Sequence, residues 1–203
     1  MALILETYVT ENENCSSFFF HDSTPLYNSV ENPGGYDPTG VNGFDPNSID
    51  ISNLILQITL PDNTIIEIVI PPNALNIDNI GGTGLITTEI VAEDLGYTDK
   101  ITDGVYTFKY IIDDGNNKKY YNTCKILANC QVCQCLEKKL IDINLCTNCT
   151  ESQRTRRIND LYHAWMLKDK AKHAVACNDV SSAVNIINYL LDYCNISRCD
   201  SCN

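Results

Sequence analysis

The spacing of apolar residues changes near Cys124, and this change limits the folds open to the chain. Before Cys124, apolar side chains alternate, as in GVYTFKYIID over residues 104–113, which is the period of a β-strand. After Cys124 they recur at every third or fourth position, as in Val180, Ala183 and Ile187, which is the period of an amphipathic helix. The sequence of 203 residues therefore predicts an α+β protein with a β part followed by a helical part.

Short strand-like runs separated by turns occupy residues 51–128. ISNLILQITL and TIIEIVI flank the turn Pro61-Asp62-Asn63 and predict a β-hairpin, and three further runs, LITTEIV, GVYTFKYIID and KYYNTCKIL, follow. Runs at this spacing without intervening helices favour an antiparallel sandwich or a small barrel. We expect an antiparallel β-sandwich of the immunoglobulin-like kind.

Residues 129–203 have helical periodicity in three stretches, near residues 132–144, 152–176 and 180–194. Thr150 or Ser152 is suited to cap the second stretch. Because the connections are short, the stretches predict a small cysteine-rich α-helical bundle of about three helices.

Residues 1–50 are rich in turn signals such as Pro33-Gly34 and Asn42-Gly43, and they predict an extended N-terminal arm. Tyr27, Tyr36 and Phe44 make this stretch too apolar for a solvated linker. We expect these aromatic side chains to pack on a surface. That surface is either the sheet of the same chain or a neighbouring subunit.

Charge is distributed unevenly along the chain. Residues 1–123 carry a net charge of −14, whereas residues 124–203 carry +2. An acidic front part repels nucleic acid and anionic membranes. The chain also has neither an apolar run long enough to cross a bilayer nor a secretory signal, so we expect a soluble protein made in the cytosol.

Arg154, Arg156 and Arg157 form a basic cluster at the start of the second predicted helix, where positive charge opposes the helix dipole. Either these arginines pair with acidic residues across a subunit interface, or they form a solvated basic patch.

Eleven cysteines allow a metal site, disulfides or buried thiols. Cys146, Cys149, Cys199 and Cys202 form two Cys-x-x-Cys pairs that an up-down-up bundle brings to one end. Four thiolates in that arrangement would hold a structural zinc ion, closed to water. Cytosolic thiols stay reduced, but the thiols of a released particle oxidise later.

The sequence has no pattern typical of an enzyme. The three histidines have no catalytic spacing, and the chain has neither a glycine-rich phosphate loop after a strand nor a nucleophile elbow. We therefore expect a protein that acts through its surfaces.

The order of parts resembles structural proteins of tailed phages of gut Bacteroides, in particular the crAss-like phages. The resemblance lies in YNSVENPGGY of the arm, the strand GVYTFKY, the transition TCKILANCQVCQCLEKKL and the helical stretch AVACND. It implies a virion component, a ring protein of the tail or of the neck next to the portal. Its partners would be identical subunits and other tail, neck or portal proteins, with DNA passing nearby but not specifically bound, and no membrane.

Two other functions fit the same residues. A host-binding or carbohydrate-binding module on the virion surface would use exposed tyrosines such as Tyr27 and Tyr36. A structural-zinc regulatory protein would instead use the four cysteines.

Overall fold

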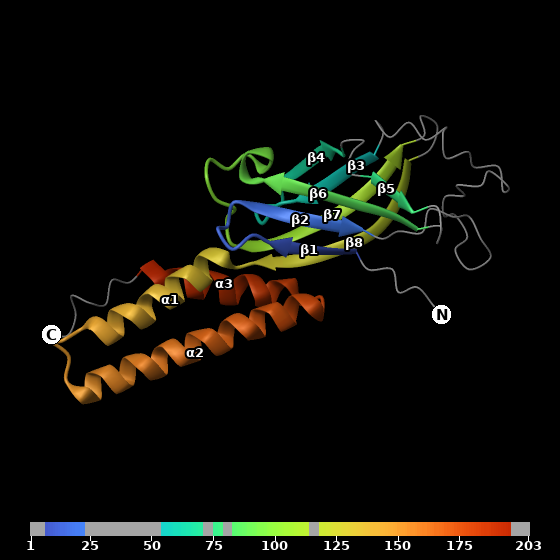
Figure 1. Ribbon diagram of the computed structural model, residues 1–203. Coiled ribbons are helices and arrows are strands. Elements are labelled where there is room, and N and C mark those ends of the chain that lie inside the picture. Colours follow the sequence, from blue (N-terminus) through green and yellow to red (C-terminus); the bar gives the residue numbers. More distant parts are fainter. Residues whose placement is uncertain (1–6, 23–53, 71–74, 79–82, 114–117, 196–203) are drawn as a thin grey trace. The chain divides into compact units, whose positions relative to one another are not determined.

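The computed structural model describes residues 7–22, 54–70, 75–78, 83–113 and 118–195 (Figure 1). Within these residues the fold is α+β, with two four-stranded sheets, three α-helices and one short 3-10 helix, η4 (Ala92–Leu95). The chain forms two compact units: a β unit, Met1–Lys100 with Thr107–Cys124, and a helical unit, Ile101–Tyr106 with Lys125–Asn203. The last strand ends at Ala128, and the first α-helix begins at Cys130.

The β unit contains two sheets (Figure 1). The first has the order β1-β2-β6-β5, formed by β1 (Thr7–Glu11), β2 (Ser17–Asp22), β6 (Thr83–Val91) and β5 (Leu75–Asp78), and all its neighbours are antiparallel. The second has the order β4-β3-β7-β8, formed by β4 (Ile65–Val69), β3 (Leu54–Thr59), β7 (Gly104–Asp113) and β8 (Lys118–Ala128).

Aromatic side chains join the two sheets. The rings of Phe18 and Phe20 on β2 lie 5.4 and 6.2 Å, centroid to centroid, from the ring of Phe108 on β7. All three side chains are fully buried. Because such rings bury large apolar areas and gain further from edge-to-face and offset contacts, they form the centre of the β core.

The predicted β3–β4 hairpin is confirmed. Ile58 pairs with Ile66 in antiparallel register. In the turn, the Asp62 carboxylate accepts a hydrogen bond of 2.9 Å from the Thr64 N–H, and this bond holds the pKa of Asp62 below its usual value. Asn63 has a φ of 69°, a left-handed conformation that asparagine tolerates well.

The beginning of the chain differs from the predicted arm, because residues 7–22 form β1 and β2 of the first sheet. Three consecutive phenylalanines hide the strand period, since Phe18 and Phe20 are buried while Phe19 is half-buried. Ser17 is also buried, and it donates a 2.7 Å hydrogen bond to Glu89. The remainder of the predicted arm, with Tyr27, Tyr36 and Phe44, lies outside the described residues.

The helical unit contains α1 (Cys130–Leu145), α2 (Glu151–Ala176) and α3 (Val180–Asn195), as predicted (Figure 1). Each helix turns its apolar stripe inward, and the buried residues form one cluster that includes Leu136, Ile143, Leu161, Ala171, Ile187 and Leu190. Alanines at the contacts let the helices approach closely. A disulfide between Cys135 of α1 and Cys194 of α3 ties two of the helices together.

Asp103 binds the beginning of α1 from a distant part of the sequence. Its carboxylate accepts hydrogen bonds of 3.0 Å from the Gln131 N–H and 2.7 Å from the Val132 N–H. The Gln131 side chain in turn donates to the Ile101 carbonyl at 2.6 Å. Two orphan N–H groups of the first turn are thereby satisfied by a residue of the loop before β7. Burial raises the pKa of Asp103 to about 6, although both N–H bonds oppose that shift.

Thr150 caps α2, as predicted, through a capping box. The Gln153 N–H donates to the Thr150 hydroxyl, and the Thr150 N–H donates to the Gln153 side chain at 2.9 Å.

We expect Thr150→Ala to lower the free energy of unfolding by about 1 kcal/mol, because one orphan N–H of α2 loses its partner. Urea denaturation followed by circular dichroism measures this change. Thr147→Ala, in the same turn but outside the capping box, is the control and should have little effect. Equal losses in both variants would contradict a capping role for Thr150.

Candidate functional site at the turn between α1 and α2

The turn between α1 and α2 brings two sulfur atoms into contact. Cys146 is the C-cap residue that follows Leu145 at the end of α1, and Cys149 immediately precedes Thr150, the N-cap of α2. The two Sγ atoms are 3.2 Å apart. Both side chains are partly exposed, so small thiols in solution can reach this turn.

These neighbouring sulfurs are in different oxidation states. Cys149 is half of a disulfide, whereas Cys146 is a thiol. Cys15 and Cys130 are also disulfide-bonded, as are Cys135 and Cys194. Of the three uses that the cysteine count allows, the structure therefore contains disulfides.

The four predicted zinc ligands are not found together as thiols. Cys149 is oxidised, and a disulfide sulfur is not the thiolate that zinc binds. Cys199 and Cys202 lie outside the described residues. In the described part of the chain, no group of three or more His, Cys, Asp or Glu side chains is arranged to hold a metal ion.

The three arginines of the predicted basic cluster have different surroundings. Arg154 donates a 3.0 Å hydrogen bond from Nη2 to the carbonyl oxygen of Cys146. It thus places positive charge at the C-terminal end of α1, where the helix dipole favours a cation. Arg156 is exposed and Arg157 is half-buried. Arg154 therefore has a role within its own chain that the sequence did not predict.

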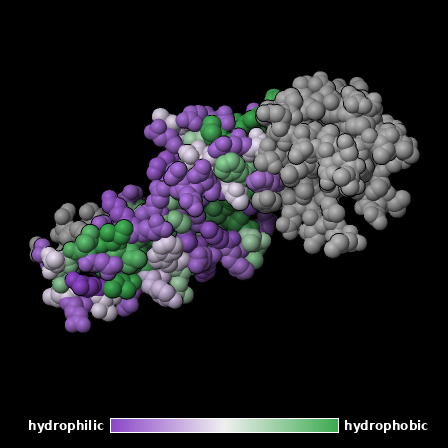
Figure 2. Space-filling model, viewed as in Figure 1, coloured by the Kyte–Doolittle hydropathy of each residue, from purple (hydrophilic) through white to green (hydrophobic). Residues whose placement is uncertain are grey.

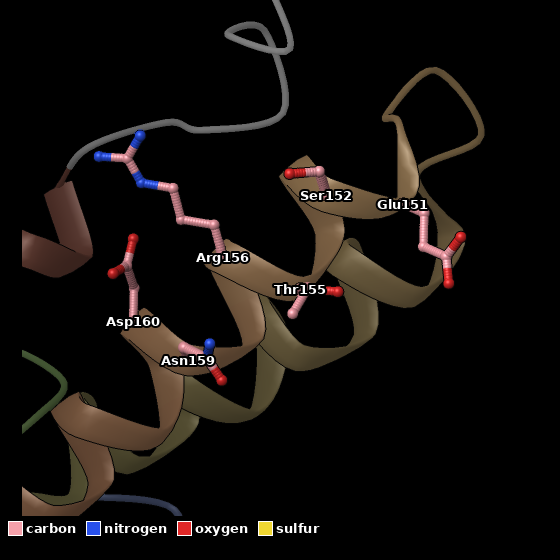
Figure 3. Close-up of a pocket in the computed structure, with 6 residues that line it drawn as sticks. All are labelled: Glu151, Ser152, Thr155, Arg156, Asn159 and Asp160. Carbon is pink, nitrogen blue, oxygen red and sulfur yellow. The ribbon is translucent and has the colours of Figure 1, made fainter.

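A shallow hollow of about 550 Å³ lies beside the first turns of α2 (Figure 3). Figure 3 shows the side chains of Arg156 and Asp160 pointing to the same side of the helix, with Glu151 at the opposite end of the hollow. Its lining is entirely polar or charged: Glu151, Ser152, Thr155, Arg156, Asn159 and Asp160. Such a surface is suited to a mixed-charge contact.

Two rows of exposed apolar side chains follow α1 and α2. On α1, Ile141 and Leu145 are one helical turn apart and are 57% and 72% exposed. On α2, Ile158, Tyr162 and Met166 follow each other at intervals of four residues and are also exposed. Figure 2 shows hydrophobic surface where α1 ends and α2 begins. We call these five residues the two apolar rows.

Comparison with known proteins adds little. No known protein family and no curated protein matches the chain. A solved structure, the chitinase ChiW from Paenibacillus sp. str. FPU-7, is similar over 61% of this chain at 10% sequence identity and a TM-score of 0.33. The chain spans 8% of the length of that protein, and so low a similarity carries no argument about fold or activity.

The described helices also bear on membrane insertion. None of them combines the length and the apolar character needed to cross a bilayer.

Proposed function

We propose that the chain is a structural subunit of a phage virion, a ring-forming protein of the tail or of the neck next to the portal. The observation that carries this proposal is the pair of apolar rows. Large apolar side chains that follow the exposed faces of two neighbouring helices are typical of protein contact surfaces. The resemblance of the sequence to crAss-like phage structural proteins gives the contact its biological setting.

Charge favours a second copy of the chain as the partner. The helical part, residues 124–203, carries +2 and includes the exposed Arg156, whereas residues 1–123 carry −14. The helical part of one copy therefore attracts the acidic part of the next. Contacts between unlike surfaces generate rings when the rotation closes, which is the arrangement that a ring protein needs.

The disulfides support a protein that works outside reducing cytoplasm. Disulfides persist in oxidising surroundings and are rare in cytosolic proteins of mesophiles. A virion protein is made in the reducing cytoplasm of the bacterial host and is then released with the particle into oxidising surroundings. The thiols then oxidise after release.

Two finer assignments belong to the same proposal. We assign the two facing sheets to an immunoglobulin-like sandwich, on the basis of the antiparallel pairing and the contacts of Phe108 across the core. Zinc at Cys146, Cys149, Cys199 and Cys202 stays a prediction for the reduced chain, since it requires the thiolate of Cys149.

Light scattering on the purified chain tests the ring proposal. We expect self-association that weakens at high ionic strength, because salt screens attraction between the unlike parts. Ile141→Asp together with Tyr162→Asp places two charges on the apolar rows and should weaken association by about tenfold or more.

Tyr189→Asp is the matched control, because Tyr189 is also more than half exposed but lies on α3 outside the rows. It should leave association unchanged. A chain that stays monomeric at every ionic strength, and that is also missing from purified virions by mass spectrometry, would overturn the proposal.

A further inference from the structure

We propose that Cys146 and Cys149 form a thiol–disulfide exchange site, in which the Cys146 sulfur displaces the present disulfide partner of Cys149. This inference is independent of the ring proposal, because it concerns covalent chemistry within one chain. It rests on three observations at the turn: a thiol, a disulfide sulfur and the distance between them.

The distance brings the reacting atoms into contact. At 3.2 Å, the Cys146 and Cys149 sulfurs lie within the range of about 3 to 3.5 Å from which bond formation begins. A thiol elsewhere in solution must first find the disulfide. The Cys146 thiol is already beside it.

The structure on either side holds this contact in place. Arg154 binds the carbonyl of Cys146, and the capping box of Thr150 and Gln153 fixes the residue after Cys149. The turn therefore cannot open without breaking these hydrogen bonds. The effective concentration of the Cys146 thiol at Cys149 is high for this reason.

The chemistry balances without an external oxidant or reductant. The Cys146 thiol loses its proton to solvent, and the resulting thiolate attacks Sγ of Cys149. A bond between Cys146 and Cys149 forms while the bond from Cys149 to its present partner breaks. The partner cysteine leaves as a thiolate and takes up a proton, so the number of disulfides and the number of thiols are unchanged.

The exchange has a structural consequence. Before exchange, Cys149 tethers the α1–α2 turn to another cysteine. After exchange, the disulfide is local to the sequence Cys146-Thr147-Asn148-Cys149 and the tether is open.

The first experiment maps disulfides in the full wild-type chain. The chain is equilibrated at mildly alkaline pH, labelled with N-ethylmaleimide, digested and analysed by mass spectrometry. We expect two populations: label on Cys146 with Cys149 in its original disulfide, and label on the former partner with a Cys146–Cys149 disulfide. Label on Cys146 alone, with no Cys146–Cys149 linkage, would overturn the proposal and leave a simple sulfur contact.

The second experiment follows the release of the disulfide partner of Cys149 by N-ethylmaleimide labelling in Cys146→Ser and in the wild-type chain at the same pH. In this variant the partner of Cys149 should become labelled at least about ten times more slowly than in the wild-type chain. Cys177→Ser removes an exposed free thiol at the end of α2 and should leave the labelling rate of that partner at the wild-type value. Equal labelling rates in the Cys146→Ser and wild-type chains would contradict attack by Cys146, and circular dichroism checks that the variant is folded.

Discussion

Replacing Cys135 and Cys194 together by serine should lower the free energy of unfolding by about 4 kcal/mol. The disulfide between them spans 59 residues and joins α1 to α3, so its loss greatly increases the conformational freedom of the unfolded chain. Urea denaturation of the oxidised double variant and of the oxidised wild-type chain measures the difference.

The control for this experiment is the double variant Cys133→Ser and Cys177→Ser. It changes two cysteines of the same unit that carry thiols, and we expect a loss several times smaller. Adding a reductant to both proteins should remove the difference between them, because the wild-type chain then also lacks this disulfide. If the oxidised wild-type chain and that variant unfold at the same urea concentration, the disulfide does not stabilise the helical unit.

The stability of the wild-type chain should fall relative to Asp103→Asn as the pH rises. Burial raises the pKa of Asp103 from 3.8 in the unfolded chain to about 6 in the folded one. Between these values the folded state holds a proton that the unfolded state has lost, so acid favours folding. The contribution is complete below the unfolded pKa and is lost as the pH rises through about 6.

The expected size of this effect is about 3 kcal/mol between pH of about 4 and about 7, since each pKa unit corresponds to about 1.4 kcal/mol. Asparagine keeps an acceptor oxygen for α1 but does not titrate, so the difference between the two proteins isolates Asp103. Chemical denaturation across this pH range provides the measurement. If the free energies of unfolding of the wild-type chain and the variant differ by the same amount at every pH, Asp103 has the same pKa in the folded and unfolded states.

The elements with clear periodicity could be predicted from the sequence. Along α3 and β7, one-sided burial imposes a spacing of apolar residues that is visible in the sequence itself. The hairpin of β3 and β4 was predictable for a related reason, since Asp62 and Asn63 are turn residues with a local backbone cause. Such features depend on neighbours within a few positions.

Features that depend on distant residues could not be predicted in this way. The bond from Asp103 to α1 joins residues 28 and 29 positions apart, and nothing near Asp103 in the sequence indicates a helix cap. Likewise, eleven cysteines allow many pairings, and spacing alone does not select Cys135 with Cys194. β2 was missed because its three phenylalanines do not alternate with polar residues.

The candidate site shows the same division. The two Cys-x-x-Cys sulfurs at Cys146 and Cys149 were identified from spacing, which also suggested zinc. Their different oxidation states depend on the fold of the whole chain. The role of Arg154 was missed because its partner is the backbone carbonyl of Cys146. Every residue has such a carbonyl, so the sequence does not indicate which one accepts the hydrogen bond.

The position of Asp103 also limits how the chain can be cut. The helical unit is not a continuous stretch of sequence, because it includes Ile101–Tyr106 as well as Lys125–Asn203. A C-terminal fragment starting at Lys125 would contain all three helices but not the carboxylate that binds the first turn of α1. During translation the ribosome makes Asp103 before α1, so the capping carboxylate is already present when the helix emerges.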